Sequence, residues 1–104
     1  MIKIGVYGSL KKGHYNNVML KGKEPLEVKK IKGTMYRVSS YPVLMEYGDK
    51  EYDLEIYEVD KETYLRIFHM EIGAGYRAVE MEDYVVFYGL KDYNIEGLEE
   101  IDEY

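Results

Sequence analysis

The sequence predicts an α+β fold: a small curled antiparallel or mixed β-barrel of about six strands, accompanied by one or two short helices. Three observations lead to this prediction. Several short runs alternate apolar and polar residues with period two, which is typical of half-buried strands. Most of these runs are separated by short turn-forming segments, as in hairpins. The regular alternation of strand and helix that a doubly wound parallel sheet requires is absent.

The chain opens with a strand over residues 2–7, in which every second residue is apolar and can face a core. A turn-like segment with glycines at both ends, residues 8–13, ends this strand. Asn16 or Asn17 is then expected to cap a short helix.

The middle of the chain, residues 26–46, is rich in β-forming residues and is expected to form strands, with a bulge at Gly33. Residues 39–42 are predicted to turn a corner. A hairpin turn is predicted at residues 47–50, and a further strand follows at residues 52–59.

A helix is predicted to begin after Asp60, which is a suitable N-cap, and to run to about Met70. The helical wheel places its apolar face at Tyr64, Leu65, Phe68 and Ile72. The last two predicted strands lie at residues 76–81 and 84–88.

The 104 residues fit one domain, which we place at residues 1–90, followed by an acidic C-terminal tail at residues 91–104. Hydrophobic residues make up 46% of the chain, which is enough for one core. No apolar run approaches the length of a membrane-spanning helix, and the first residues lack the apolar core of a signal peptide. We therefore expect a cytoplasmic protein with no membrane partner. The oligomeric state is left open.

The formal net charge of −6 argues against nucleic acid as a partner, because an acidic surface repels a polyanion unless its basic groups are segregated. Residues 21–32 are locally basic, but Glu24 and Glu27 interrupt the run. A strand edge guarded by lysines is the better interpretation of this segment, and nucleic acid binding is the weaker one.

Metal and thiol chemistry have no support in the sequence. The chain has no cysteine, which excludes disulfides, thiolate ligands and a cysteine nucleophile. His14 and His69 each lack a partner at metal-ligand spacing, so no metal is expected. Ser9 lacks the G-x-S-x-G context of a nucleophile. Glu80 and Glu82 are interpreted as a solvent-facing rim rather than an acid/base pair.

The glycine segment after the first strand is the first candidate site. Gly8 and Gly13 have phosphate-loop spacing, but His14-Tyr15 stands where that motif needs Lys-Ser/Thr. One interpretation is a tight strand exit that uses the backbone freedom of glycine, and spacing alone slightly favours it. The other is a nest of main-chain N–H groups, from Gly8 to Leu10, that binds a carboxylate or an oxyanion.

Glu71 is the second candidate. It lies at the border of the predicted apolar helix face, where partial desolvation raises the pKa of a carboxyl group and makes it a better base near neutral pH. Gly73-Ala74-Gly75 follows it, so the side chain lies where a helix opens into a loop. Without further information, a boundary residue that reaches water or pairs with Arg77 is the more common case.

These segments together resemble the gamma-glutamylcyclotransferase superfamily, especially its small gamma-glutamylamine cyclotransferase-like branch. Tyr7-Gly8-Ser9-Leu10-Lys11-Lys12-Gly13-His14-Tyr15-Asn16 is similar to that family's Y-G-[ST]-L-[KR]-x-G-x-x-N motif. Supporting likenesses lie at Gly33-Thr34-Met35-Tyr36, Tyr41-Pro42, Ile56-Tyr57-Glu58-Val59-Asp60, Glu71 and Tyr76-Arg77. The resemblance covers roughly residues 2–88.

The resemblance implies a small mixed α/β barrel whose Y-G-[ST]-L loop and catalytic glutamate face one cavity. The substrate-binding residues that it implies are Tyr7, Gly8, Ser9, Leu10, Tyr76 and Arg77. It also implies that Glu71 is the catalytic base, that no cofactor is needed, and that the partner is a small gamma-glutamyl compound. Such a compound carries its own nucleophile, the α-amine, so that ring closure to 5-oxoproline is intramolecular.

A second hypothesis from another class stays open. Ile72-Gly73-Ala74-Gly75 follows Glu71 in place of the family's usual proline-containing segment. A non-catalytic member of the same fold, which binds a small ligand or a protein, is therefore the alternative to the enzyme.

Overall fold

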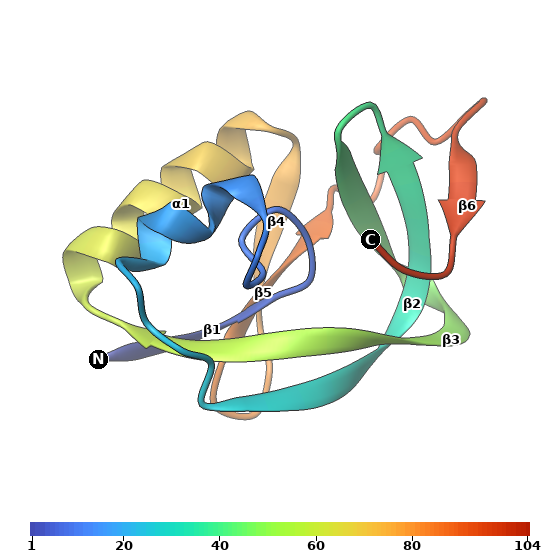
Figure 1. Ribbon diagram of the computed structural model, residues 1–104. Helices are drawn as coiled ribbons and strands as arrows, with labels where there is room; N and C mark the ends of the chain where they lie inside the picture. Colours follow the sequence, from blue (N-terminus) through green and yellow to red (C-terminus); the bar gives the residue numbers. More distant parts are fainter.

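One six-stranded sheet, a helix and a short 3-10 helix make up the computed structural model, which describes residues 1–104 (Figure 1). The elements in chain order are β1 (Ile2–Val6), η1 (Tyr15–Leu20), β2 (Glu27–Val38), β3 (Tyr41–Val59), α1 (Lys61–Gly73), β4 (Tyr76–Glu80), β5 (Val85–Gly89) and β6 (Glu99–Ile101). The predicted α+β class, with about six strands and one or two short helices, is confirmed.

The strands lie in the order β4-β5-β1-β3-β2-β6. All neighbours are antiparallel except β1 and β5, which are parallel, so the sheet is mixed. The predicted barrel does not close, because β4 and β6 have no hydrogen-bonded partner on their outer sides. β6 reaches only three residues of β2, Met35 to Arg37, and leaves the first half of β2 as a free edge.

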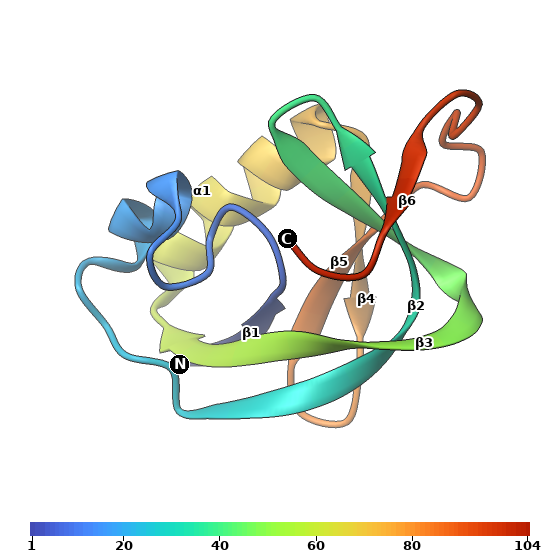
Figure 2. The same cartoon turned by 45° about the vertical axis from the view of Figure 1, so that its right-hand side comes forward.

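A β-bulge bends the long hairpin of β2 and β3. Gly33 pairs with Lys50 while Thr34 pairs with Met45, so residues 46–49 of β3 have no counterpart on β2. The irregularity predicted at Gly33 is present as a register shift between Gly33 and Thr34, although the extra residues lie on β3. The hairpin turn predicted at residues 47–50 is wrong, because β3 continues through this segment and absorbs the extra residues as a bend. Figure 2 shows the outer end of the hairpin turned back over the sheet.

α1 begins as predicted, since the side chain of Asp60 accepts a hydrogen bond of 2.7 Å from the main-chain N–H of Thr63. The predicted apolar face is partly wrong. Ile67 is fully buried, whereas Leu65 and Ile72 are 41% and 44% exposed. The helix therefore packs on the sheet around Ile67, and Glu71, one turn later, lies on the same side. Neither α1 nor any other helix is long and apolar enough to cross a membrane.

Two groups of buried side chains cover the two faces of the sheet. Ile4 and Val6 of β1 pack with Ile67 of α1 in one group. Leu54 and Ile56 of β3 belong to the other group, which also contains Tyr7, Met35, Tyr88 and Ile101. Because successive side chains of a strand point to opposite faces, β3 and β5 supply residues to both groups.

The acidic segment at residues 91–104 contributes β6 to the sheet. Ile101 is buried in the second group of core residues, and Lys50 forms ion pairs with Glu100 at 2.7 Å and Asp102 at 2.8 Å. The segment is acidic, as expected, but its apolar residue and main chain are part of the fold. Sequence alone did not indicate this pairing, because its partner lies more than sixty residues earlier, at Met35–Arg37.

Candidate active site

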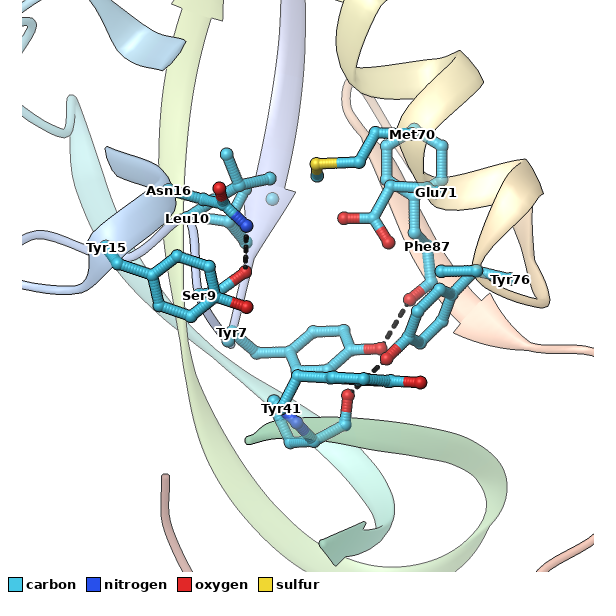
Figure 3. Close-up of a pocket in the computed structure, with 15 residues that line it drawn as sticks. Tyr7, Ser9, Leu10, Tyr15, Asn16, Tyr41, Met70, Glu71, Tyr76 and Phe87 are labelled. Carbon is cyan, nitrogen blue, oxygen red and sulfur yellow. Dashed lines mark hydrogen bonds between the residues drawn. The ribbon is translucent and has the colours of Figure 1, made fainter. Parts of the chain in front are cut away.

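A cavity of about 220 Å³ lies between the loop after β1, η1 and the last turn of α1 (Figure 3). Its lining is mostly apolar. Six of the residues expected at the site line it: Tyr7, Gly8, Ser9, Leu10, Glu71 and Tyr76. The fold thus brings the start of the chain and the end of α1 to one place.

Glu71 points its carboxylate into this cavity from the last turn of α1 (Figure 3). The side chain is half-buried, and no hydrogen bond or ion pair within the protein holds it. Burial raises the pKa of Glu71 from 4.5 to about 7. A carboxyl group with such a pKa can both take and give a proton near neutral pH.

The loop of Gly8, Ser9 and Leu10 forms another part of the wall. The Gly8 carbonyl accepts from the main-chain N–H of Lys11 at 2.9 Å, which closes a tight turn. None of the N–H groups of Gly8, Ser9 and Leu10 donates to an acceptor of the protein. These donors are therefore available to an oxyanion or a carboxylate.

Gly8 also has a packing role. A Cβ atom on Gly8 would lie 2.9 Å from Cγ and 3.0 Å from Cδ of Pro42, which is closer than side chains normally approach. The loop can lie this close to β3 only because the residue has no side chain.

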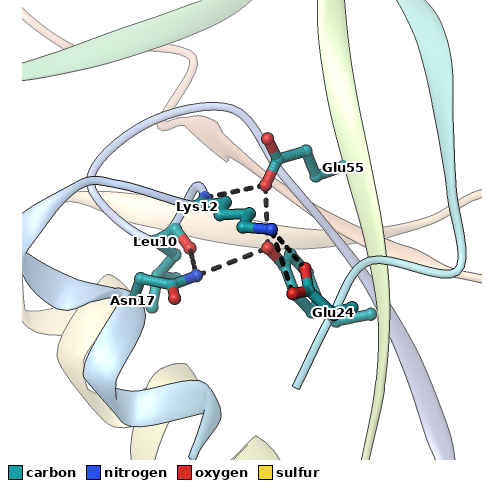
Figure 4. Close-up of polar contacts among 6 residues, drawn as sticks. Leu10, Lys12, Asn17, Glu24 and Glu55 are labelled. Atoms are coloured by element: carbon teal, nitrogen blue, oxygen red, sulfur yellow. Dashed lines mark hydrogen bonds and ion pairs between the residues drawn. The ribbon is translucent and has the colours of Figure 1, made fainter. Parts of the chain in front are cut away.

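The two asparagines after the loop do not cap η1. Its N-cap is His14, which makes no side-chain capping bond. Asn16 instead reaches back to Ser9, with Nδ2 donating to Oγ at 2.9 Å and the main-chain N–H donating to the carbonyl at 2.9 Å. Asn17 Nδ2 donates to the carbonyl of Leu10 at 2.8 Å (Figure 4). Both asparagines thus stabilise the loop rather than the helix.

The far side of the loop is attached to β3. The main-chain N–H of Lys12 donates to Oε1 of Glu55 at 2.9 Å (Figure 4). The Tyr57 hydroxyl donates to the same oxygen at 2.8 Å. Burial, and then this contact with Glu55, raises the pKa of Tyr57 to about 12. The loop is therefore positioned from two sides before any ligand binds.

Tyr7 and Tyr76 have their hydroxyl protons committed to main-chain carbonyls. Tyr7 donates to the carbonyl of Phe87 at 2.6 Å (Figure 3). Tyr7 also accepts from the N–H of Leu44 at 3.3 Å, and Tyr76 donates to the carbonyl of Pro42. Burial raises the pKa of both phenols, and the negative charge of Glu71 raises it further. Both remain neutral, and they can offer a ligand lone pairs but no proton.

Arg77 is not in this cavity, contrary to what we expected from its place beside Tyr76. Neighbouring residues of a strand point to opposite faces, and Tyr76 takes the face toward the cavity. Arg77 forms an ion pair with Glu46 of β3 and lines a separate hollow. The pairing of Arg77 with Glu71 that the sequence left open is likewise absent.

Neither histidine lines the cavity. His14 stacks on Tyr104, with ring centroids 5.0 Å apart. No group of three or more His, Asp or Glu side chains is placed to hold a metal ion.

Several residues of the wall were not expected at the site from the sequence. They are Tyr15, Asn16, Tyr41, Pro42, Met70 and Phe87. Asn16 and Tyr41-Pro42 lie within segments that carry the family resemblance, which is the one signal that singles them out. Phe87 comes from β5, and nothing local in its sequence marks it.

Comparison with known proteins places these observations in context. A family model described as "Gamma-glutamyl cyclotransferase, AIG2-like" matches residues 4–103. The chain is 41% identical over 80 residues to "Putative gamma-glutamylcyclotransferase PH0828" of Pyrococcus horikoshii, which covers 77% of this chain and 68% of that protein. The crystal structure of PH0828 matches with a TM-score of 0.73 and 35% identity, over 86% of this chain and 78% of that chain.

Proposed function

The chain belongs to the gamma-glutamyl cyclotransferase, AIG2-like family, and on this basis we propose that it converts a gamma-glutamyl amine or peptide into 5-oxoproline and a free amine, with Glu71 as general base and acid. One observation carries the proposal: an unpaired carboxylate with a pKa of about 7 shares a cavity with the unpaired main-chain donors of Gly8, Ser9 and Leu10.

The two sides of the cavity suit the two ends of the substrate. The donors of the Gly8–Leu10 loop can hold the α-carboxylate and the oxygen of the γ-carbonyl, which becomes more negative during the reaction. Glu71 and the lone pairs of Tyr76 can receive the α-ammonium group. A substrate bound in this way is folded back on itself, with its amine close to its own γ-carbonyl.

The reaction then needs two proton transfers. Glu71 takes a proton from the α-ammonium group, and the free amine attacks the γ-carbonyl carbon to form the new C–N bond of the ring. The C–N bond to the leaving amine breaks as protonated Glu71 returns the proton to the leaving nitrogen. The second proton of the former ammonium group goes to the released amine, so the products are 5-oxoproline and the protonated form of that amine.

Proximity supplies much of the rate in this scheme. The nucleophile and the carbonyl belong to one molecule, and a well-oriented intramolecular attack corresponds to an effective concentration of roughly 10⁵ M or more. The protein contributes the folded conformation of the substrate, the proton transfers and the stabilisation of the oxyanion.

The test is release of 5-oxoproline from a panel of gamma-glutamyl amines, gamma-glutamyl dipeptides and glutathione. Glu71→Gln should lower kcat by roughly 10² to 10⁴, because the amide cannot act as a base, and should still bind 5-oxoproline. Glu62→Gln is the matched control, since Glu62 lies on the exposed side of the same helix and pairs only with Arg66. Equal activity of Glu71→Gln and the wild type would exclude Glu71 as the base.

The same assay decides between the enzyme and a binding module. The segment after Glu71, residues 72–75, departs from the family's usual sequence and favours the binding module. Binding of gamma-glutamyl compounds without release of 5-oxoproline from any panel member would establish that alternative.

A further inference from the structure

Asn16 lines the candidate site, and its side chain makes one hydrogen bond there, to Ser9. Its amide Nδ2 donates to Oγ of Ser9 at 2.9 Å, and both residues line the cavity that contains Glu71 (Figure 3). The main-chain N–H of Asn16 donates to the Ser9 carbonyl at 2.9 Å, so two hydrogen bonds fix the two residues relative to one another.

The direction of the side-chain bond has a chemical consequence. A serine hydroxyl has one proton to donate and two lone pairs to accept with. Since Asn16 occupies a lone pair of Ser9, the hydroxyl proton is left to donate elsewhere, and no acceptor of the protein receives it. Ser9 therefore adds a side-chain donor to the main-chain donors of Gly8 and Leu10.

The opposite side of the cavity has the reverse character. Tyr76 gives its hydroxyl proton to the carbonyl of Pro42, and Glu71 is unpaired, so both present lone pairs to a ligand. Donors on one side and acceptors on the other define how a molecule with a carboxylate and an ammonium group would be oriented.

We propose that Asn16 is a positioning residue that holds the Ser9 hydroxyl as a hydrogen-bond donor to a substrate oxygen. This inference rests on the proposed cyclotransferase function and deepens it: Asn16 touches no reacting atom but determines which way the Ser9 dipole points. The substrate class that follows is a compound with an anionic or developing oxyanion group on the Ser9 side of the cavity.

A double-mutant cycle tests whether Asn16 acts through Ser9. Ser9→Ala should lower kcat/KM for the best gamma-glutamyl substrate about tenfold or more, as expected for a hydrogen bond to a charged oxygen. Asn16→Leu, of similar size and without the amide, should lower it by a smaller factor, because the hydroxyl stays but can rotate. The double variant should match Ser9→Ala to within about twofold.

Asn17→Leu is the matched control for a merely structural role. Asn17 holds the same loop through the carbonyl of Leu10 and makes no hydrogen bond to Ser9. Its effect should therefore multiply with that of Ser9→Ala, whereas the effect of Asn16→Leu should vanish in the Ser9→Ala background. Thermal unfolding of each variant checks that the loop variants remain folded.

Asn16→Asp tests the direction of the bond. A carboxylate at residue 16 accepts the Ser9 proton and withdraws the donor from the substrate, so this variant should lose more activity than Asn16→Leu when Ser9 is present. In the Ser9→Ala background, the difference in activity between Asn16→Asp and Asn16→Leu should shrink to the effect of the added negative charge. Ser9→Thr, which keeps the hydroxyl, should restore the dependence on Asn16.

The outcomes separate the inference from the function on which it rests. If the wild type releases 5-oxoproline and the effects of Ser9→Ala and Asn16→Leu on kcat/KM simply multiply, the inference is wrong. The proposed cyclotransferase function is then unaffected. In Asn16→Asp the Ser9 hydroxyl donates to the carboxylate of residue 16 and no longer to the substrate. Activity of this variant equal to that of the wild type would therefore also overturn the inference. No 5-oxoproline from the wild type would overturn both.

Discussion

At the scale of single residues, the site depends on one carboxylate that is partly removed from water and has no partner. Glu71 reaches the cavity because it follows the fully buried Ile67 by one helical turn. Burial that suits a base also costs stability, since the charged form of Glu71 is poorly solvated at neutral pH.

The raised pKa of Glu71 predicts a pH-dependent gain in stability for Glu71→Gln. The folded pKa of about 7 lies above the usual 4.5, so the folded state binds the proton more tightly than the unfolded state between these values. Stability therefore falls as pH rises from 4.5 to about 7 and then levels off. Glu71→Gln should raise the free energy of unfolding by roughly 1–2 kcal/mol at about pH 8 and by less at about pH 5.

Urea unfolding at the two pH values measures this gain, with Glu62→Gln as the control that should show no such pH dependence. A gain that is equal at both pH values would contradict a raised pKa at Glu71. A gain in the free energy of unfolding that appears only at the higher pH would show that the ionised carboxylate of Glu71, the proposed base, destabilises the folded protein.

Gly8 gives a second prediction at this scale. Gly8→Ala would place a Cβ against the Pro42 ring, whose backbone lies in β3 and cannot move freely. We expect the loop to shift and turnover to fall at least tenfold, because small displacements of oriented groups are costly in catalysis. Gly73→Ala is the matched control: a Cβ there meets nothing within 4 Å, so activity should persist. Steady-state kinetics and thermal unfolding of both variants check the prediction.

At the scale of elements, the bulge between β2 and β3 shapes the sheet. Gly48 adopts φ of 102°, which side chains rarely allow, and the Thr34 hydroxyl donates to the adjacent carbonyl of Tyr47 at 2.7 Å. These features let β3 bend between its two halves, and the first residues of its first half, Tyr41 and Pro42, form part of the cavity wall.

Gly48→Ala should therefore destabilise the protein by about 2 kcal/mol or more. The added Cβ would lie 2.3 Å from Oγ1 of Thr34, and the residue would have to keep a strained φ. Asp49→Ala, at the neighbouring exposed position, should change the free energy of unfolding by no more than about 0.5 kcal/mol. Chemical denaturation of the two variants makes the comparison, and similar values would contradict the proposed importance of the bulge.

At the scale of the whole molecule, the last residues are attached to the segments that form the site. Lys11 Nζ donates to the carbonyl oxygen of Tyr104 at 3.1 Å, and the Tyr104 hydroxyl donates to the carbonyl of Ser40. The Tyr52 hydroxyl donates to the carbonyl of Ile101 at 3.0 Å and accepts from the N–H of Met35. β6 thus connects the C-terminal segment with β2 and β3.

Ile101→Ala should lower the free energy of unfolding by roughly 2–4 kcal/mol, because it removes a buried side chain from the second core group. Glu103→Ala, at an exposed position two residues later, should have an effect of at most about 0.5 kcal/mol. Thermal and urea unfolding measure both. A small effect of Ile101→Ala would mean that β6 is dispensable and that residues 91–104 behave as a tail.

Features with a local cause could be predicted from the sequence. Alternation of apolar residues predicted β1 and much of β2 and β3, and Asp60 before the helix predicted its N-cap. Gly33 predicted the bulge. Motif resemblance, rather than spacing, singled out Glu71 and the Gly8–Leu10 loop as a possible pair.

Features that depend on distant partners could not be predicted. The helical wheel could not show that α1 packs around Ile67 and leaves Leu65 exposed, because the packing face is chosen by the sheet beneath it. The position of Arg77 depends on which face of β4 turns inward, and that of Asn16 on the path of the loop after β1.

By itself, the amino-acid sequence determined most of the secondary structure, the acidic character and the presence of a glycine loop and a borderline carboxylate. Only the tertiary structure decided that these two candidates share one cavity, that Asn16 and Asn17 stabilise the loop, that Arg77 faces away, and that the last strand joins β2. The physical reason is the distance along the chain over which each interaction acts. Periodicity and hydrogen bonds within a segment depend on neighbouring residues, whereas burial and strand pairing depend on residues that are far apart in the sequence and that only the folded chain brings together.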